Sequence, residues 1–288
     1  MPIVDAHVHL WEAGSPRAAH RQQPLLADEA LRGMDAAGID AAILIPPPWD
    51  PASDATCLRA ARAHPERFRA MVSVSLEPQS GIVQLESVRK QHEVCGLRYI
   101  LNEDRHGVML REGELDWLWS AASAAGMPVA LAISRHLAHV GDIARRFPRL
   151  RLLLDHLAVP INTTGAAAFA HLSLLVDLAR HDNVAVKASA TPSFSEAPFP
   201  YADIHPFLER AFRAYGASRF FWGSDITKLP CSWRQSVAAF TDHLAFLTDS
   251  HRASVMGDGL AQWLRLPFDA PRRDLDAARH GSSRPSIS

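Results

Sequence analysis

The segment IVDAHVHL, residues 3 to 10, decides the fold class and is the first pointer to a site. Apolar residues alternate in it with Asp5, His7 and His9, and a period of two is typical of a β-strand. Side chains two positions apart lie on one face of a strand, so we expect these three to project into one polar space. The intervening apolar residues, which we expect to face surrounding helices, are Val4, Ala6 and Val8.

Seven further short apolar runs follow, each entered after Gly, Pro, Asn or a charged residue. They occupy residues 40–46, 69–76, 96–101, 128–134, 151–157, 183–189 and 219–225. Helical patterns lie between them, for example at residues 28–38, 116–126 and 168–182. Near-continuous apolar strands are buried on both faces, which indicates a parallel sheet wrapped by helices. Eight strand and helix units favour an α/β fold of one domain, a closed (β/α)8 TIM barrel.

Composition excludes several classes of protein. The chain has 288 residues, 48% of them hydrophobic, with 30 Lys and Arg against 31 Asp and Glu. It can therefore bury a large core, and it has no basic excess for binding nucleic acid or anionic lipid. No run approaches 18 apolar residues, and the three Cys form no CxxC pair, so we expect a cytoplasmic protein without membrane contact.

The last 22 residues differ in composition from the rest. Residues 267–288 lose apolar periodicity and are rich in Arg, Ser and Pro. Such a segment cannot bury enough apolar surface to order itself. We therefore expect the barrel domain to span residues 1–266 and a disordered tail to follow.

Chemistry in a TIM barrel occurs at the carboxyl ends of the strands. His7 and His9 end the first run, Asp155 and His156 the sixth, and Asp225 the eighth. A His-x-His pair alone is expected by chance in a chain with 15 His, so its weight comes from these further residues at other strand ends. Imidazoles beside a carboxylate can bind an attacking water and take its proton. The pattern predicts a hydrolytic site.

Five segments together resemble the amidohydrolase superfamily, in the amidohydrolase-related branch that contains pyrone-dicarboxylate, sulfomuconolactone and sugar lactonases. They are DAHVHLW (5–11), GLRYIL (96–101), LLLDHLAVP (152–160), VAVKAS (184–189) and FWGSDITKLP (221–230). The resemblance extends to about residue 266. It implies an enzyme with a (β/α)8 fold that opens a small, carboxylated lactone by water attack. The catalytic residues would be Asp225 as general base and His156.

The resemblance also suggests a metal site, with His7, His9, His156 and Asp225 as ligands. Two features depart from the family. Ala132 stands in the fifth run where superfamily members with a firm metal place a His, and Ile226-Thr227-Lys228 replaces Trp-Pro after Asp225. Two alternatives stay open: one divalent metal, Zn or Mn, or metal-independent chemistry in which the His side chains polarise the carbonyl as donors.

Three further residues are predicted to bind substrate. Arg98 follows Gly96, and its planar fork can grip a carboxylate; a surface ion pair is the alternative. Lys187 lies in an apolar strand, so its ammonium should point into the polar mouth. Trp11 lies two residues beyond His9 and would form an apolar wall, or else plug the barrel top.

Two other functions remain open on this scaffold. A decarboxylase of an aromatic or unsaturated acid would use the same His and Asp set to protonate a carbon. A binding protein without turnover fits poorly with an intact site. Phosphate-loop, HExxH, GxSxG and GxGxxG motifs are missing, so no nucleotide cofactor is expected. The sequence does not identify the lactone, and it leaves a homo-oligomer open.

Overall fold

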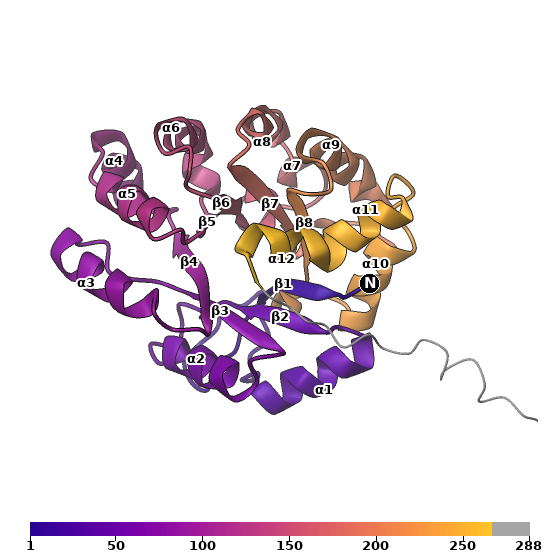
Figure 1. Cartoon of the computed structure of the whole chain (residues 1–288). Helices are drawn as coiled ribbons and strands as arrows, with labels where there is room; N and C mark the ends of the chain where they lie inside the picture. The colour runs from indigo at the N-terminus through magenta and orange to yellow at the C-terminus, as the bar shows by residue number, and fades with distance from the viewer. Residues whose placement is uncertain (267–288) are drawn as a thin grey trace, which may run out of the picture.

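The computed structural model describes residues 1–266, which form one (β/α)8 barrel (Figure 1). Within that range eight parallel strands pair in sequence order, and the predicted α/β barrel is confirmed. The strands are β1 (Val4–Val8), β2 (Ala41–Leu44), β3 (Phe68–Val72), β4 (Val94–Ile100), β5 (Val129–Ala132), β6 (Leu152–Leu154), β7 (Val184–Ser189) and β8 (Phe220–Gly223). All eight apolar runs therefore become strands.

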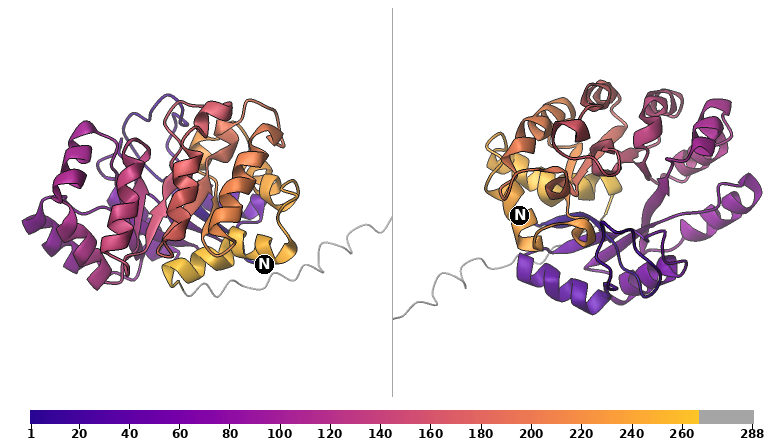
Figure 2. Two further views of the ribbon diagram at one scale, coloured as in Figure 1. Left: turned by 90° about the horizontal axis from the view of Figure 1, so that it is seen from above. Right: turned by 180° about the vertical axis from the view of Figure 1, so that it is seen from behind.

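Helices surround the strands on the outside, as the views from above and behind show (Figure 2). They are α1 (Ala27–Ala37), α2 (Ser53–Ala63), α3 (Pro78–Val88), α4 (Asp104–Glu112), α5 (Asp116–Ala124), α6 (Val140–Arg146), α7 (Gly165–Ala168), α8 (Leu172–Asp177), α9 (His205–Tyr215), α10 (Trp233–Thr241), α11 (Asp249–Ala253) and α12 (Gly259–Leu264). None of the helices in residues 1–266 is long and apolar enough to cross a membrane.

The helix expected over residues 168–182 is broken in two. Helix α7 ends at Ala168, and α8 begins only at Leu172. Between them, the ring of His171 forms a hydrogen bond with the carbonyl of Leu157, 2.8 Å away. This bond ties the break to the loop after β6, a tertiary contact that periodicity does not reveal. The predicted tail, residues 267–288, lies outside the described residues.

The first strand differs from the expected pattern. Val4 and Ala6 pack with the apolar side chains inside the barrel, and not against the helices as predicted. Val8 does pack against the helical layer. The pairing of β1 with β2 shifts register between Asp5 and Val8, which marks a bulge. Because a bulge inserts one residue, it reverses the inward and outward alternation along the strand.

The seam between β8 and β1 is closed through the carboxylate of Asp5. Its Oδ1 accepts hydrogen bonds from the backbone N–H of Ser224 at 2.8 Å and of His7 at 3.0 Å. Its Oδ2 accepts one from the indole N–H of Trp233 in α10 at 2.7 Å. Asp5 thus faces the helices and joins two strands. The prediction that it shares a face with His7 and His9 is wrong.

Two glycines allow close packing inside the barrel. A Cβ at Gly223 would lie 3.1 Å from the Cβ of Ser189 and 3.2 Å from that of Ala6. At Gly96 a Cβ would lie 2.5 Å from the Cε of Met71. A Cβ at Gly96 would also lie 2.8 Å from the backbone carbonyl oxygen of Pro128, so this position needs glycine, whereas a Cβ at Gly223 would only be crowded. Apolar side chains fill the interior of the barrel, and the buried polar residues of the site lie at the carboxyl ends of the strands.

Candidate active site

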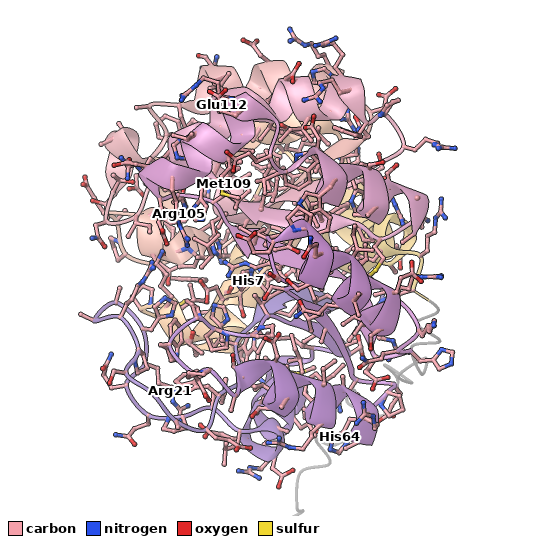
Figure 3. The ribbon with its side chains drawn as sticks, turned by 90° about the vertical axis from the view of Figure 1, so that its left-hand side faces the viewer. His7, Arg21, His64, Arg105, Met109 and Glu112 are labelled. Atoms are coloured by element: carbon pink, nitrogen blue, oxygen red, sulfur yellow. The ribbon has the colours of Figure 1, made fainter. Side chains whose placement is uncertain are left out.

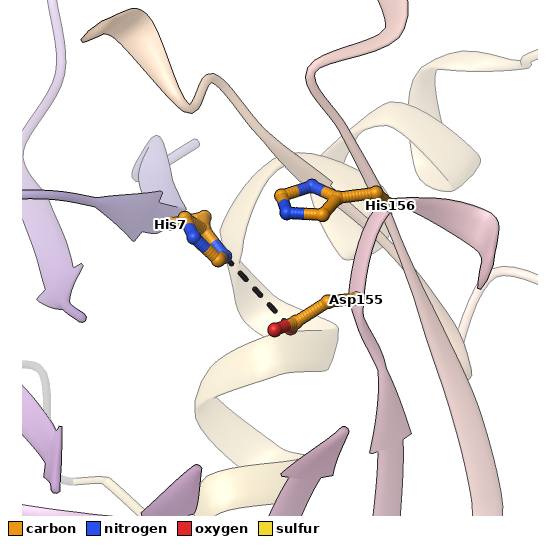
Figure 4. A group of neighbouring side chains, drawn as sticks. All are labelled: His7, Asp155 and His156. Atoms are coloured by element: carbon orange, nitrogen blue, oxygen red, sulfur yellow. Dashed lines mark ion pairs between the residues drawn. The ribbon is translucent and has the colours of Figure 1, made fainter. Parts of the chain in front are cut away.

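Five side chains predicted to belong to the site meet at the carboxyl ends of β1, β6 and β8. They are His7, His9, Asp155, His156 and Asp225. Ligand atoms of His7, His9 and Asp225 all lie within 4.8 Å of one another, as do those of His7, Asp155 and His156. Figure 4 shows the second group, with His7 from β1 facing Asp155 and His156 from the end of β6. Figure 3 shows His7 near the centre of the molecule and His64 at its edge.

His9 is held in one tautomer. Its Nδ1 lies 2.6 Å from the carbonyl oxygen of Ile45, so Nδ1 carries the proton and donates it. Its Nε2 is then an acceptor, and it lies 3.3 Å from the Nε2 of His7. Two ring nitrogens therefore converge on one point of the site.

Asp155 is a buried carboxylate surrounded by cations. Its Oδ1 lies 3.0 Å from the Nζ of Lys187, and its Oδ2 lies 3.1 Å from the Nε of Arg98. The Nδ1 of His7 lies 3.8 Å from Oδ1. Burial alone would raise the pKa of Asp155, but the positive charge of Lys187, the adjacent ring of His7 and the charge of Arg98 hold that pKa well below its usual value. Asp155 therefore stays ionised and orients His7.

His156 and Asp225 occupy strained backbone positions. Both have left-handed conformations, with φ of 56° and 52°, and neither is a glycine. Such residues cost about 1–3 kcal/mol each and persist at functional sites. The conformation lets the backbone N–H of Asp225 donate to the carbonyl of His7 at 2.9 Å. The Oγ of Ser224 accepts from the N–H of Ile226 at 3.0 Å. Asp225 is the N-cap residue of the short turn Ile226–Lys228, but its side chain makes no capping hydrogen bond, so its carboxylate remains available.

The Asp225 carboxylate faces two histidines. Its Oδ1 lies 3.6 Å from the Nε2 of His9, and its Oδ2 lies 3.9 Å from the Nε2 of His156. The other nitrogen of His156, Nδ1, lies 2.8 Å from the Oγ of Ser189 on β7. This contact fixes the ring of His156 so that its Nε2 faces Asp225.

Burial controls the charge of the site. It lowers the pKa of His7 and His9 well below their usual value and that of His156 to about 3, so all three are neutral at pH 7. Burial also raises the pKa of Asp225 to about 7, although Lys228 and Arg98 oppose this shift. Desolvation thus outweighs the nearby cations at Asp225, so its carboxyl group titrates near neutral pH.

A cavity of about 440 Å³ opens above these residues. His9, His156 and Asp225 lie at its wall together with Arg98. Three further groups come from loops after the strands: Arg17 and His20 after β1, and Lys228 after β8. The apolar residues that line the cavity include Ile100, Ala132, Ile133, Ala158, Val159 and Ile161. The lining of the cavity thus combines cationic and apolar residues.

Two residues predicted to bind substrate, Lys187 and Trp11, do not line the cavity. Lys187 is fully buried inside the barrel and does not line the cavity, because its ammonium faces Asp155. Trp11 is also fully buried, with its ring 5.5 Å from that of Trp49. Trp49 is the aromatic residue that lines the cavity. Arg98 does line it, and its Nη fork stays available because Asp155 takes the Nε.

His20 was not found from sequence. It lies in a loop without periodicity, and its Nδ1 is 3.2 Å from the Oγ1 of Thr227. That hydroxyl is in turn 3.5 Å from Asp225. The sequence places Thr227 two residues after Asp225, but it gives no indication that His20 contacts Thr227.

The donor set fits a divalent metal ion. Two nitrogens of a tetrahedral Zn site, each about 2.0–2.1 Å from the ion, lie about 3.3 Å apart. The Nε2 atoms of His7 and His9 show this separation, 3.3 Å, and both imidazoles are neutral. The buried Nδ1 of His7 has no hydrogen-bond partner within the described residues, and it faces Asp155, as a metal-bound tautomer requires.

The fold and site define a (β/α)8-barrel protein whose catalytic face carries a histidine and carboxylate cluster. The model of the amidohydrolase family matches residues 4–277, and the chain belongs to this family. The match extends past residue 266.

Individual relatives and solved structures similar to this chain carry different descriptions. The L-fucono-1,5-lactonase of Burkholderia ambifaria is 34% identical over 164 residues, which are 51% of this chain and 52% of that protein. The chain thus spans about half the length of this relative. Three solved structures share the fold. An amidohydrolase of Burkholderia multivorans with bound Zn has a TM-score of 0.78 at 21% identity, covering 93% of this chain and 100% of that chain.

The other two structures differ in described activity. A putative 2-pyrone-4,6-dicarboxylic acid hydrolase of Pseudomonas putida has a TM-score of 0.70 at 21% identity, covering 94% and 99% of the two chains. A 2,6-dihydroxybenzoate decarboxylase of Rhizobium has a TM-score of 0.67 at 14% identity, covering 92% and 98%. At these identities the likeness concerns the fold alone.

Proposed function

We propose that this protein is a lactonase that opens a small, carboxylated lactone by water attack on the ester carbonyl. The observation that carries the proposal is the Asp225 carboxylate at the cavity wall, buried, strained in backbone and facing His9 and His156. A carboxylate with a pKa of about 7 is matched to proton transfer at neutral pH. The lactonase relative supports this choice of reaction.

Asp225 acts as the general base and His156 stabilises the developing oxyanion. Asp225 takes a proton from water as the oxygen adds to the carbonyl carbon. Because Ser189 fixes Nδ1 of His156, its Nε2 side faces the reacting centre, where a neutral imidazole donates a hydrogen bond. When the ring C–O bond breaks, the alkoxide receives the proton from Asp225. The product is a hydroxy acid, and the carboxylate base is regenerated.

His7, His9 and Asp225 are suited to hold one divalent ion, Zn or Mn. When bound, the ion would polarise the carbonyl and lower the pKa of water. The two oxygens of Asp225 would have different roles. Oδ1 faces His9 and would bind the ion, while Oδ2 faces His156 and remains free to take a proton.

Metal binding is open to a direct test. We expect chelator-treated protein to bind one equivalent of Zn, measured by calorimetry, with a raised melting temperature. His9→Gln should bind Zn at least about tenfold more weakly, because even the loss of a residue that only supports a metal ligand lowers metal affinity by about this factor. His64→Gln, at the end of α2, is the matched control. Equal Zn affinity in His9→Gln would exclude this ligand set.

The pH dependence follows from Asp225. The base acts only when deprotonated, and burial raises its pKa to about 7, so kcat/KM of the chelated enzyme should rise with pH and level off above 7. Below the midpoint the rate should fall about tenfold per pH unit. A bound cation favours the carboxylate and moves the midpoint down, so profiles with and without Zn are compared. A rate that falls as pH rises from 6 to 8 would contradict this assignment.

Arg98 is proposed to bind the substrate carboxylate through its free Nη fork. Arg98→Met should raise KM for a carboxylated lactone by roughly 10-fold to 100-fold, because hydrogen bonds to charged groups contribute about 1.5–3 kcal/mol. A neutral lactone of the same ring size should be affected much less. Equal losses on both substrates would mean that Arg98 acts only through Asp155, which it also contacts.

The bond that breaks is identified with labelled water. Lactone opened by the enzyme in H₂¹⁸O should carry one ¹⁸O in the new carboxylate, measured by mass spectrometry. Label in the hydroxyl group would mean attack on the alkyl carbon and would contradict the proposed mechanism.

A decarboxylase remains the second candidate, since a barrel of this fold performs that reaction in Rhizobium. We rank it lower because Ala132, on β5, supplies no further ligand for a firm metal. The cytoplasmic location, the end of the domain near residue 266 and a homo-oligomer remain predictions.

A further inference from the structure

A second cavity lies at the opposite end of the barrel from the catalytic face. Its volume is about 330 Å³, and it is bounded by the amino-terminal ends of β4, β5 and β6, by β3 and by the end of α12. The charged and polar residues at its wall are Arg69, Arg89, Gln91, His92, Arg151 and Arg265. No Asp or Glu of residues 1–266 lines it. This cavity therefore concentrates positive charge in a protein whose net charge is −1.

Two of the arginines are held in place by backbone carbonyls. Arg151 is half-buried and donates through its two Nη groups to the carbonyls of Trp263 and Gly126, the latter at 2.7 Å. Arg69 donates through Nη1 to Pro65 and, at 2.9 Å, to Phe68. These bonds orient the guanidinium groups but neutralise no charge. The Nε of Arg151 and the Nε and Nη2 of Arg69 have no hydrogen-bond partner within residues 1–266.

Arg265 adds a third charge, and no ion pair joins it to a carboxylate of residues 1–266. It caps α12 in a left-handed backbone conformation with φ of 56°, and its side chain lines the cavity. Burial and the nearby charge of Arg265 both lower the pKa of Arg151, so the two cations repel each other. Arg89 differs, because it forms an ion pair with Glu86 at 2.6 Å. Like charges brought together at a cavity wall are stabilised when an anion lies between them.

We propose that this cavity is a binding site for a phosphate-type oxyanion, held by Arg69, Arg151 and Arg265. A phosphate carries about two charges and several acceptor oxygens, so it can receive donors from three directions, which one carboxylate cannot. In TIM barrels the catalytic residues lie at the carboxyl ends of the strands, and residues at the amino-terminal face, where this cavity lies, contribute to the stability of the fold. A bound anion should therefore raise the stability of the fold and leave lactone turnover unchanged.

The test titrates the full-length protein with inorganic phosphate and, separately, ribose 5-phosphate, with chloride at matched ionic strength as the reference. We expect one saturable site by calorimetry and a rise in Tm of roughly 5 °C at about 100 times Kd. Tighter binding of the ester would identify a phosphorylated metabolite, and equal binding would identify the phosphate group alone.

Two variants locate the site. Arg265→Gln should weaken Kd by at least about tenfold, because it removes a charged donor. Arg105→Gln, an exposed arginine of α4 paired with Glu103, is the control and should bind like the original chain. A Tm shift equal to that of chloride would overturn the proposal. So would unchanged binding in Arg265→Gln, or competition between phosphate and the lactone substrate, which would place the anion in the catalytic cavity.

Discussion

Asp225→Asn is expected to lower kcat on a lactone by about 10²-fold to 10⁴-fold, the usual contribution of a general base. The amide keeps the size and the hydrogen bonds of the side chain but cannot take a proton at neutral pH. KM should change little, because the substrate carboxylate contacts other residues. The measurement is steady-state kinetics on a confirmed substrate at pH 8, where the original carboxyl group is mostly ionised.

The control separates chemistry from folding. Asp249→Asn changes a fully exposed carboxylate of α11 and should retain full activity. Both variants should retain the melting temperature to within a few degrees. Turnover by Asp225→Asn within a factor of about three of the original rate would remove Asp225 from the base role.

Lys187→Met should destabilise the fold by about 3 kcal/mol, at the lower end of the 3–5 kcal/mol typical of a broken buried ion pair. Lys187 and Asp155 are both fully buried, 3.0 Å apart, and the substitution leaves a carboxylate with Arg98 as its remaining cation. The measurement is denaturant unfolding at pH 7. Lys90→Met, an exposed lysine after α3, is the matched control.

The sign of the pH dependence gives a second readout. In the original chain the pKa of Asp155 is depressed, so its stabilisation is present above the unfolded pKa and is lost only at very low pH. Without Lys187 that pKa should rise, so protonation of Asp155 as the pH falls should relieve part of the penalty. The double variant Lys187→Met, Asp155→Asn should recover part of the stability at pH 7. A loss below about 1 kcal/mol, independent of pH, would contradict the buried pair.

Strand positions were predictable because their signal is local. Each apolar run between Gly, Pro, Asn or charged residues became a strand, and the barrel then determined which ends meet. His7, His9, His156 and Asp225 were predictable for the same reason, since residues at the carboxyl ends of parallel strands converge. No contact had to be known to place them together.

The remainder depends on contacts between distant segments. The register of β1 against β2 shifts between Asp5 and Val8, and Asp5 accepts a hydrogen bond from Ser224 after β8. The sequence of a single strand does not encode these contacts. Lys187 was correctly seen as unusual in an apolar strand, but its partner Asp155 lies 32 positions away. The loops that carry His20 and Trp49 to the cavity have no period, so neither residue could be assigned to it.

The central claim is lactone hydrolysis, and proton balance tests it most directly. The full chain is assayed in weak buffer near pH 6 with an indicator, against sugar lactones, muconolactones, pyrone carboxylates and aromatic acids, with and without chelator. We predict acid release on at least one carboxylated lactone, lost in Asp225→Asn. Acid uptake with carbon dioxide evolved from an aromatic carboxylate, and no reaction on any lactone, would contradict the account and identify a decarboxylase.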